Sequence, residues 1–218
     1  MIGVEQLRSH LQSTRAFFGP RAAGWEERFP DDEPLYAAAV AELCPPQGGV
    51  VVDLGCGTGR ALADLRRAVG GDGVVVGIDA TPEMLEVARA RHSDARSDLL
   101  LADATSLPLA PGSVAAIFAA GLLTHVPDPR ELLRTLARVS RPGCRLALFH
   151  PVGRAVLAAR HERMLAPDDL LDPSVLPDVL TGTGWVTERI DDSDDRYLAI
   201  AHVASDRRDP EVAKTARR

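Results

Sequence analysis

The sequence predicts an α/β fold in which a mostly parallel sheet carries helices on both faces. Between residues 50 and 150, short apolar runs alternate with amphipathic segments, which is typical of strand–helix–strand units. These runs are nearly continuous in apolar residues, as expected for strands that are covered on both sides. Near the end of the chain, two further apolar runs are separated by a short polar stretch, and so short a connection joins only antiparallel neighbours.

The elements follow from these patterns in chain order. Central strands are predicted at residues 50–54, 74–78, 99–102, 114–119 and 145–149, and a closing hairpin at 185–190 and 197–203 around the turn 191–195. Helices are predicted at residues 60–69, 81–92, 128–140, 152–165 and 172–181. Thr81 and Asp128 stand as N-caps with a proline directly behind each, and the Arg-Pro-Gly stretch 141–143 is a helix terminator.

The chain thus divides into three parts. Residues 1–45 form a helical N-terminal segment, residues 46–204 form the sheet domain, and the polar residues 205–218 form a C-terminal tail that we expect to fray.

Composition argues against several classes of function. The net charge of −6 disfavours a large phosphate-binding surface, so we expect no nucleic-acid partner. No apolar run reaches the roughly 18 residues of a membrane span, and the first residues lack a signal-peptide pattern, so we expect no membrane association and a cytoplasmic location. The cysteines Cys44, Cys56 and Cys144 lack zinc-site spacing, which predicts buried reduced thiols and no metal.

A glycine loop, Gly55-x-Gly57-x-Gly59, lies directly between the first strand and the first helix of the sheet domain. Glycines there allow a tight turn and a close approach of a ligand to the backbone. The dinucleotide-binding pattern G-x-G-x-x-G fails in both registers, because Arg60 and Leu62 stand where it needs its last glycine. The loop therefore indicates a ligand other than a dinucleotide.

Three successive strands end in an aspartate: Asp53, Asp79 and Asp103. The carboxyl edge of an open α/β sheet is where such folds bind ligands. Asp53 would repel a pyrophosphate but suits a cationic amino-acid group, directly or through water. Asp79 has roughly the 20-residue spacing at which a strand-end acid meets ribose hydroxyls. Asp103 offers an acceptor for an exocyclic amine.

These motifs resemble the class I S-adenosylmethionine-dependent methyltransferases, and among them the small-molecule group often called type 11. The resemblance covers about residues 48 to 150. It is carried by Val51-Val-Asp-Leu-Gly-Cys-Gly-Thr-Gly59, Gly77-Ile-Asp-Ala-Thr-Pro-Glu-Met-Leu85, Leu101-Ala-Asp-Ala-Thr-Ser-Leu-Pro-Leu109, residues 118–128 and Arg138-Val-Ser-Arg-Pro-Gly-Cys-Arg145. Cys144 departs from the second glycine that is usual in the last motif.

The resemblance implies a Rossmann-like sheet of seven strands in the order 3-2-1-4-5-7-6 with the last strand antiparallel, an N-terminal helical lid, and S-adenosyl-L-methionine as cofactor. It implies cofactor roles for ten residues. Asp53, Gly55, Cys56 and Gly57 would surround the methionine end; Asp79 would hold the ribose, with Ala80 and Met84 near the adenine; Asp103 and the Ala104 amide would bind the adenine; Ala120 would lie near the sulfonium.

Two histidines are candidates for the reaction centre. His125 follows the fourth strand, where it serves as a catalytic base or, in the simpler interpretation, fixes a loop by a hydrogen bond. His150 closes the fifth strand, where it acts as a base or packs under the following helix.

Substrate recognition is expected outside the sheet. The aromatic residues Phe17, Phe18, Trp25 and Phe29 could line an apolar pocket in a lid, or simply pack a helix onto the sheet. After the fifth strand, Arg154, Arg160 and His161 are available to an anionic substrate.

The predicted function is methyl transfer to O, N or C of a small, apolar or aromatic metabolite. A catalytically silent cofactor-binding protein and a nucleotide-cofactor oxidoreductase remain as alternatives, and the sequence leaves open whether the chain is a monomer or a homodimer.

Overall fold

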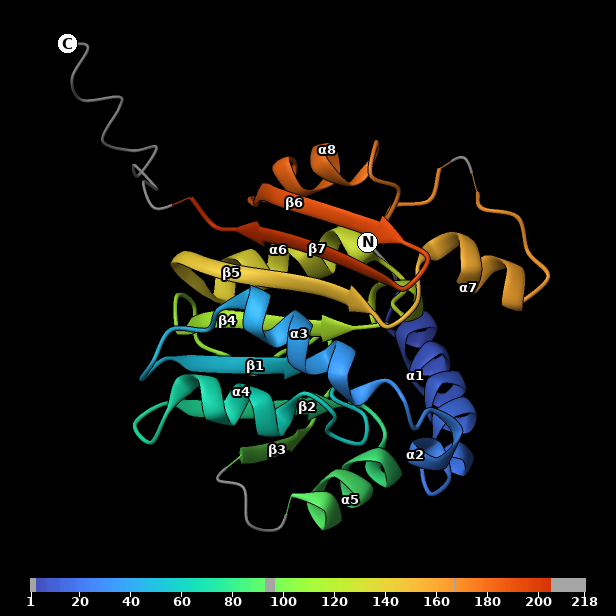
Figure 1. The fold of residues 1–218 in the computed structure, drawn as a ribbon, viewed down its shortest axis with the longest axis horizontal. Coiled ribbons are helices and arrows are strands. Elements are labelled where there is room, and N and C mark those ends of the chain that lie inside the picture. The colour runs from blue at the N-terminus through green and yellow to red at the C-terminus, as the bar shows by residue number, and fades with distance from the viewer. Residues whose placement is uncertain (1–2, 93–96, 167, 205–218) are drawn as a thin grey trace.

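In the computed structural model, which describes residues 3–92, 97–166 and 168–204, the chain folds around a seven-stranded sheet. Its strands are β1 Val50–Leu54, β2 Val74–Asp79, β3 Ser97–Leu101, β4 Val114–Ala120, β5 Ser140–His150, β6 Val186–Ser193 and β7 Arg196–His202. Their order is β3-β2-β1-β4-β5-β7-β6 (Figure 1). Strand β7 pairs antiparallel with both neighbours, and the other neighbours pair in parallel. The predicted order and the antiparallel last strand are confirmed.

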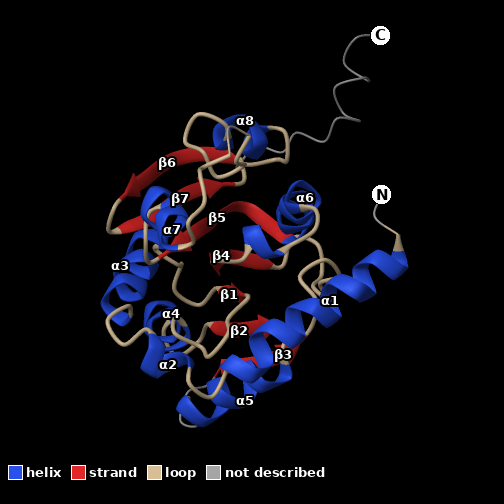
Figure 2. Cartoon of the chain, turned by 90° about the vertical axis from the view of Figure 1, so that its right-hand side faces the viewer, coloured by secondary structure: helices blue, strands red, loops and turns tan. Residues whose placement is uncertain are grey.

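Helices lie on both faces of the sheet and beyond its carboxyl edge (Figures 1 and 2). They are α1 Val4–Phe18, α2 Trp25–Arg28, α3 Glu33–Leu43, α4 Leu62–Val69, α5 Pro82–Arg91, α6 Pro129–Val139, α7 Arg154–Arg160 and α8 Leu176–Thr181, with short 3-10 turns at Gly19–Arg21 and Leu123–His125. Helix α1 lies across the carboxyl ends of the strands (Figures 1 and 2). Among the described residues, no helix is long and apolar enough to cross a membrane.

Two apolar clusters, one on each face, hold the layers together. One joins α3 and α4 to β1, β4, β5 and β7, and the other joins α6 and α8 to the opposite face. Helix α6 illustrates the pattern, because its predicted apolar stripe is fully buried and its predicted cap Asp128 accepts a hydrogen bond from the Glu131 amide at 2.9 Å. Trp185 lies over this helix and donates from Nε1 to the Leu133 carbonyl at 2.9 Å. Burial of such side chains is the main stabilising contribution to the fold.

Several element boundaries differ from the sequence prediction for local reasons. The terminator at 141–143 lies inside β5, where a register shift against β4 and a left-handed Gly143 (φ 75°) accommodate it. Helix α7 is shorter than predicted because Glu162 adopts φ 52° and ends it. Helix α8 begins late because the Asp172 carboxylate accepts from the Ser174 amide and hydroxyl, which forms a turn instead. The hairpin strands extend further toward each other than predicted, up to Ser193 and from Arg196.

Two further predictions were wrong in detail. Thr81 occupies the N-cap of α5, but its side chain makes no capping bond. Cys44 is exposed, whereas Cys56 and Cys144 are buried; all three are free thiols. The predicted tail at 205–218 lies outside the described residues.

Candidate functional site

A cavity of about 560 Å³ lies at the carboxyl ends of the parallel strands. Its floor, the sheet edge, consists of residues that end or follow β1, β2, β3, β4 and β5. Residues 3–45, the cover, close it from one side. Helix α7 with residues 161–166 and 168–175, the α7 wall, forms another side. The cavity is therefore bounded by segments from all three thirds of the chain.

The glycine loop turns back over the end of β2. The amides of Gly55 and Cys56 both donate to the Ile78 carbonyl, at 2.8 and 3.0 Å. Gly55, Gly57 and Gly59 adopt φ values of 71°, 53° and 85°, which residues with a β-carbon rarely adopt. At Gly57, a β-carbon would meet only the Met84 sulfur, 4.0 Å away. At Gly57 the loop thus presents open backbone to the cavity, whereas a β-carbon at Gly55 would lie 3.1 Å from the Leu122 side chain.

Asp79 fixes this loop to the next turn. Its Oδ2 accepts from the Gly57 amide at 2.9 Å and its Oδ1 from the Thr81 amide at 2.8 Å. Burial raises the pKa of Asp79, and these two backbone bonds act in the opposite direction. One carboxylate therefore positions both the glycine loop and the start of α5, and each oxygen retains a lone pair for a ligand.

Asp53 is buried at the end of β1, with 2% of its surface exposed. Its Oδ2 has no hydrogen-bond partner among the described residues. Burial, reinforced by the nearby negative charge of Asp79, raises the pKa of Asp53 to about 8. A cationic donor entering the cavity would satisfy this oxygen and favour the ionised carboxylate.

Asp103 completes the row of acids. Its Oδ1 accepts from the Thr105 amide at 2.9 Å, and its backbone carbonyl accepts from the Ser106 amide at 3.0 Å. The turn that follows β3 is fixed by these bonds, and Ala104 within it is buried. Each of the ten residues for which a cofactor role was implied lines the cavity: Asp53, Gly55, Cys56, Gly57, Asp79, Ala80, Met84, Asp103, Ala104 and Ala120.

The four aromatic residues of the cover also line the cavity and contact one another. Ring centroids are 4.9 Å apart for Phe17 and Phe18, 5.9 Å for Phe18 and Trp25, and 5.1 Å for Trp25 and Phe29. Their mutual angles are tilted or edge-on, the favourable arrangement for aromatic pairs. The cover therefore contributes an apolar, aromatic surface that faces the sheet edge.

Polar contacts hold the cover in place. Arg15 donates from Nε to the Ala80 carbonyl at 2.7 Å, which joins α1 to the end of β2. The His10 Nε2 lies 2.8 Å from the His125 carbonyl, which joins α1 to the loop after β4. These contacts place α1 over both ends of the cavity floor.

Arg60, directly behind the glycine loop, links that loop to the cover. It is 8% exposed and pairs with Glu26 at 3.2 Å and Asp32 at 3.1 Å. It also donates to the Phe29 carbonyl at 2.8 Å, and the Thr58 hydroxyl hydrogen-bonds the same Glu26 carboxylate. A buried guanidinium needs partners of this kind, and here they come from the cover.

His150 lines the cavity at the end of β5. Its Nδ1 lies 3.0 Å from the Val152 carbonyl oxygen and 3.2 Å from the Val152 amide. In the tautomer in which Nδ1 donates across the shorter contact, Nε2 has a free lone pair; in the other tautomer Nδ1 accepts from the Val152 amide. Burial lowers the pKa of His150, so the ring is neutral at neutral pH.

His125 lines the cavity at its rim. Its ring packs edge-on against Phe18, with centroids 5.2 Å apart, and its carbonyl is the partner of His10. Burial first, and then the neighbouring positive charges of His10, His150 and Arg163, lower the pKa of His125. Its observed contacts are those of a residue that connects the loop after β4 to the cover.

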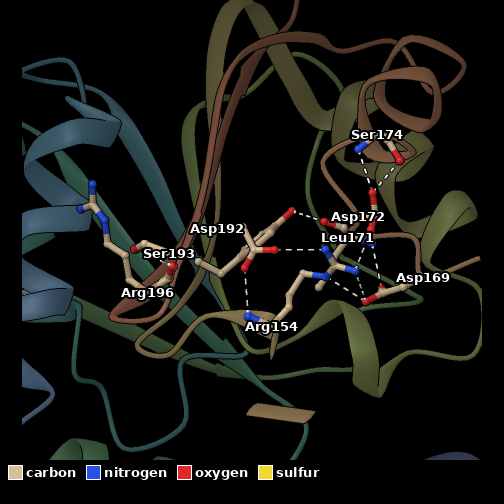
Figure 3. A network of polar contacts seen from close by, with 9 residues as sticks. Arg154, Asp169, Leu171, Asp172, Ser174, Asp192, Ser193 and Arg196 are labelled. Atoms are coloured by element: carbon tan, nitrogen blue, oxygen red, sulfur yellow. Dashed lines mark hydrogen bonds and ion pairs between the residues drawn. The ribbon is translucent and has the colours of Figure 1, made fainter. Parts of the chain in front are cut away.

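The α7 wall corrects one expectation of the sequence. Arg154 is not available to a substrate, because it is 7% exposed and bound to Asp169, Asp172 and Asp192 at 2.8 to 3.1 Å (Figure 3). Arg160 and His161, together with Arg163, do line the cavity. Within the described residues, no three acidic, histidine or cysteine side chains are grouped closely enough to hold a metal ion.

Several lining residues were missed in the sequence, among them the basic residues His10, Arg60 and Arg163. For His10 a signal existed, because His10, Thr14 and Phe18 recur at the four-residue spacing of one helix face. Arg60 was considered only as a missing glycine, and its partners lie about 30 residues away, where no local pattern shows them.

Comparison with known proteins places this geometry in a family. A family model described as a methyltransferase domain matches residues 51–143. The chain is 35% identical over 154 residues to the 2-phytyl-1,4-naphtoquinone methyltransferase of Thermosynechococcus vestitus, which covers 63% of this chain and 68% of that protein. It is 41% identical over 114 residues to methyltransferase GfsG of Streptomyces halstedii, covering 50% of this chain and 40% of that protein. The chain spans about half the length of several other curated relatives that it matches.

The fold also has solved counterparts. Magnesium protoporphyrin IX methyltransferase (ChlM) from Synechocystis PCC 6803, in a structure with bound SAH, superposes with a TM-score of 0.68. The match covers 89% of this chain and 100% of that chain at 16% identity, a level that supports likeness of fold alone.

Proposed function

This chain belongs to the class I S-adenosylmethionine-dependent methyltransferases, and on that premise we propose that it transfers a methyl group from S-adenosylmethionine to O, N or C of a small, largely apolar acceptor. The observation that carries the proposal is the row of aspartates at the ends of β1, β2 and β3, joined by an open glycine loop. The aromatic cover opposite this row supports an apolar acceptor.

The polar groups at the sheet edge fit the chemistry of S-adenosylmethionine. The unpartnered Oδ2 of Asp53 suits the cationic amino group at the methionine end. Asp79 has lone pairs for ribose hydroxyls, and Asp103 with the Ala104 amide suits an adenine. Gly55, Cys56 and Gly57, together with Ala80, Met84 and Ala120, would complete the binding surface.

When bound, this cofactor supplies an electrophilic methyl group on a sulfonium, and the protein supplies placement and, for some acceptors, a base. We assign the base to His150, whose Nε2 lone pair is free in the tautomer in which Nδ1 donates to the Val152 carbonyl. A neutral imidazole there can take a proton from a hydroxyl or ammonium acceptor as the new bond forms. His125 connects the rim of the cavity to the cover in this proposal.

The cover acts as a lid in the same proposal. Helix α3 at the end of the cover is packed into the core and stays in place. The part of the cover before α3 is joined to the rest of the chain by exchangeable polar bonds, among them those of Arg15, His10 and Arg60. Breaking them would open the cavity, and re-forming them would exclude water from the reacting groups. The aromatic residues Phe17, Phe18, Trp25 and Phe29 would then contact the acceptor.

Two alternative functions differ from methyl transfer in what they require of this site. A dinucleotide-dependent oxidoreductase would bring a pyrophosphate to the glycine loop, next to Asp53 and without the last glycine of the dinucleotide pattern. A silent binder would share the cofactor site but lack turnover.

Calorimetry distinguishes the binding functions. We expect S-adenosylhomocysteine to bind the full chain stoichiometrically and NADH not to bind. Failure of S-adenosylhomocysteine to bind would overturn the proposal. Turnover is then tested with tritium-labelled S-adenosylmethionine and a panel of aromatic and aliphatic small-molecule acceptors, where persistent absence of methyl uptake would favour the silent binder.

A further inference from the structure

The side chains that line the cavity separate by charge. The acids Asp53, Asp79 and Asp103 belong to the sheet edge. The opposite end carries basic groups from α1, the ends of β4 and β5, and the α7 wall: His10, His125, His150, Arg160, His161 and Arg163. Both ends open into one space, so a molecule that extends from the sheet edge toward the α7 wall passes from a negative to a positive environment.

Most charges in the lining already have partners. Asp32 pairs with Arg60. Arg154 is held by three carboxylates, none of which lines the cavity (Figure 3). In the described part of the chain, by contrast, Arg160 and Arg163 have no carboxylate within ion-pair distance. Two exposed arginines therefore line the cavity without a carboxylate partner.

The chain conformation fixes these two arginines at the cavity. Helix α7 ends in a Schellman motif, in which the Arg163 amide donates to the Ala158 carbonyl at 2.9 Å and the Glu162 amide to the Ala159 carbonyl at 3.0 Å. Glu162 occupies the left-handed position, where glycine is usual. Arg160 is the last residue of the helix and Arg163 the first after the left-handed turn, so both belong to one fixed chain reversal.

Positive neighbours also act on the histidines of this end. Burial is the first cause of the lowered pKa of both His125 and His150; Arg163 adds to it at His125, and Arg160 and His161 add to it at His150, where Asp32 acts in the opposite direction. A bound anion would relieve this repulsion. The lining also includes apolar residues, among them Leu11, Phe18, Leu122, Val126, Leu157 and Leu171.

We propose that the acceptor is an apolar molecule with an anionic oxygen group, such as a carboxylate, and that Arg160 and Arg163 bind that group at the α7 wall. This inference rests on the proposed function, because it takes the sheet edge to hold the cofactor. It specifies an orientation: the anionic group points to α7, and the methylated atom lies toward the sheet edge.

The test uses two probes of the same skeleton that differ in charge: 1-anilinonaphthalene-8-sulfonate, which is anionic, and N-phenyl-1-naphthylamine, which is neutral. Their affinities for the full chain are measured by fluorescence titration in saturating S-adenosylhomocysteine. The variants are R160A, R163A and the double variant, with R160K as the conservative replacement. R141A is the matched control, because Arg141 is exposed at the amino-terminal end of β5, at the opposite edge of the sheet.

We expect each single alanine variant to weaken the anionic probe about fivefold and the double variant about twentyfold, which is the range for partly exposed ion pairs. The neutral probe should change by less than about twofold in the same variants, R160K should retain most of the affinity, and R141A should change neither probe. Equal loss of both probes, or unchanged binding of the anionic probe in the double variant, would overturn the inference. S-adenosylhomocysteine affinity is measured on each variant, so failure of the cofactor site is seen separately from failure of the anion site.

Discussion

The sheet edge and the α7 wall line the same cavity, but different interactions join these two segments to their neighbours in the fold. At the sheet edge, backbone amides bind Asp79 and Asp103, and glycines shape the loop between β1 and α4. At the α7 wall, side-chain ion pairs join residues far apart in sequence, as where Arg154 meets Asp192. Backbone contacts tolerate few changes, whereas side-chain contacts can be replaced one at a time. This difference suits an enzyme whose cofactor is constant and whose acceptor has to be specified.

The cover, like the α7 wall, is joined to its neighbours by contacts between side chains that lie far apart in the sequence. Arg60 connects the sheet edge to the cover. It directly follows the glycine loop, and it pairs with Glu26 and Asp32 of the cover. Arg91 pairs with the same Glu26 carboxylate at 3.1 Å. In the proposed lid, closure of the cover would thus be coupled to the position of the glycine loop through one small group of charges.

The largest effect that separates the two regions is expected from Gly153→Ala at the start of α7. A β-carbon there would lie 1.7 Å from the Ser193 carbonyl oxygen, so the α7 wall must move away from the β6–β7 hairpin. We expect the free energy of unfolding to fall by about 3 kcal/mol, as for severe overpacking. Urea denaturation measures this, and S-adenosylhomocysteine affinity of the folded variant should be retained because the sheet edge is untouched.

Gly71→Ala is the matched control for that variant. Gly71 has open space around the position of a β-carbon and no left-handed φ, so its stability should change by less than about 0.5 kcal/mol. If both glycine variants lost the same stability, tight packing of the α7 wall against the hairpin would be contradicted.

The second largest effect is expected from His150→Ala, and it concerns the rate of methyl transfer alone. His150→Ala should slow methyl transfer about 100-fold for a hydroxyl acceptor, within the range for loss of a general base, with cofactor affinity retained. Because burial lowers the pKa of His150 below its usual value near 6.5, the wild-type rate should rise with pH through that lowered pKa and stay level above it. The variant should lack this acidic limb. His202→Ala, at the far end of β7, is the control and should keep it; an unchanged rate in His150→Ala would return His150 to a packing role.

Sequence reasoning worked best where function depends on adjacent residues. The strand–loop–helix pattern predicts the parallel sheet, the glycine loop and the row of Asp53, Asp79 and Asp103, because each is encoded within about ten residues. The order of the strands was implied by the resemblance of these motifs to a known family, not by the pattern itself. The ion pairs of Arg60 and Arg154 could not be predicted in this way. Their partners are separated in sequence and are selected only by packing of the whole chain. Arg154 was expected to face substrate for this reason, since nothing local indicates that three carboxylates surround it.

Helix ends were also hard to predict, and for a related cause. The early end of α7 depends on Glu162 adopting φ 52°, a conformation that glutamate rarely takes and that no glycine signals. The late start of α8 depends on the Asp172 side chain competing for backbone amides.

A third, smaller effect addresses the sheet edge. Asp79→Ala should weaken S-adenosylhomocysteine binding by roughly 1.5–3 kcal/mol, the range for lost hydrogen bonds to a charged group. The structure adds a cause besides direct contact, because the amides of Gly57 and Thr81 lose their acceptor. Calorimetry provides the measurement, with Asp72→Ala, exposed in the turn before β2, as control. Equal affinity in Asp79→Ala and the control would remove Asp79 from the binding site.

The smallest expected effect is the number of protons released when the ligand binds. This number tests whether Asp53 contacts a cationic group of the ligand. With a folded-state pKa of about 8, Asp53 is mostly protonated at pH 7 in the ligand-free protein. A cationic amino group beside its unpartnered Oδ2 would lower that pKa and release most of a proton on binding.

Because the folded protein binds this proton more tightly than the unfolded chain, ligand-free stability should fall as pH rises from about 4, the unfolded value, through about 8. Calorimetry of S-adenosylhomocysteine binding in two buffers of different ionisation enthalpy measures the release, and Asp53→Asn should abolish both the release and the slope. A binding enthalpy that is independent of the buffer would mean that Asp53 keeps its proton, and the methionine end of the cofactor would then need another partner.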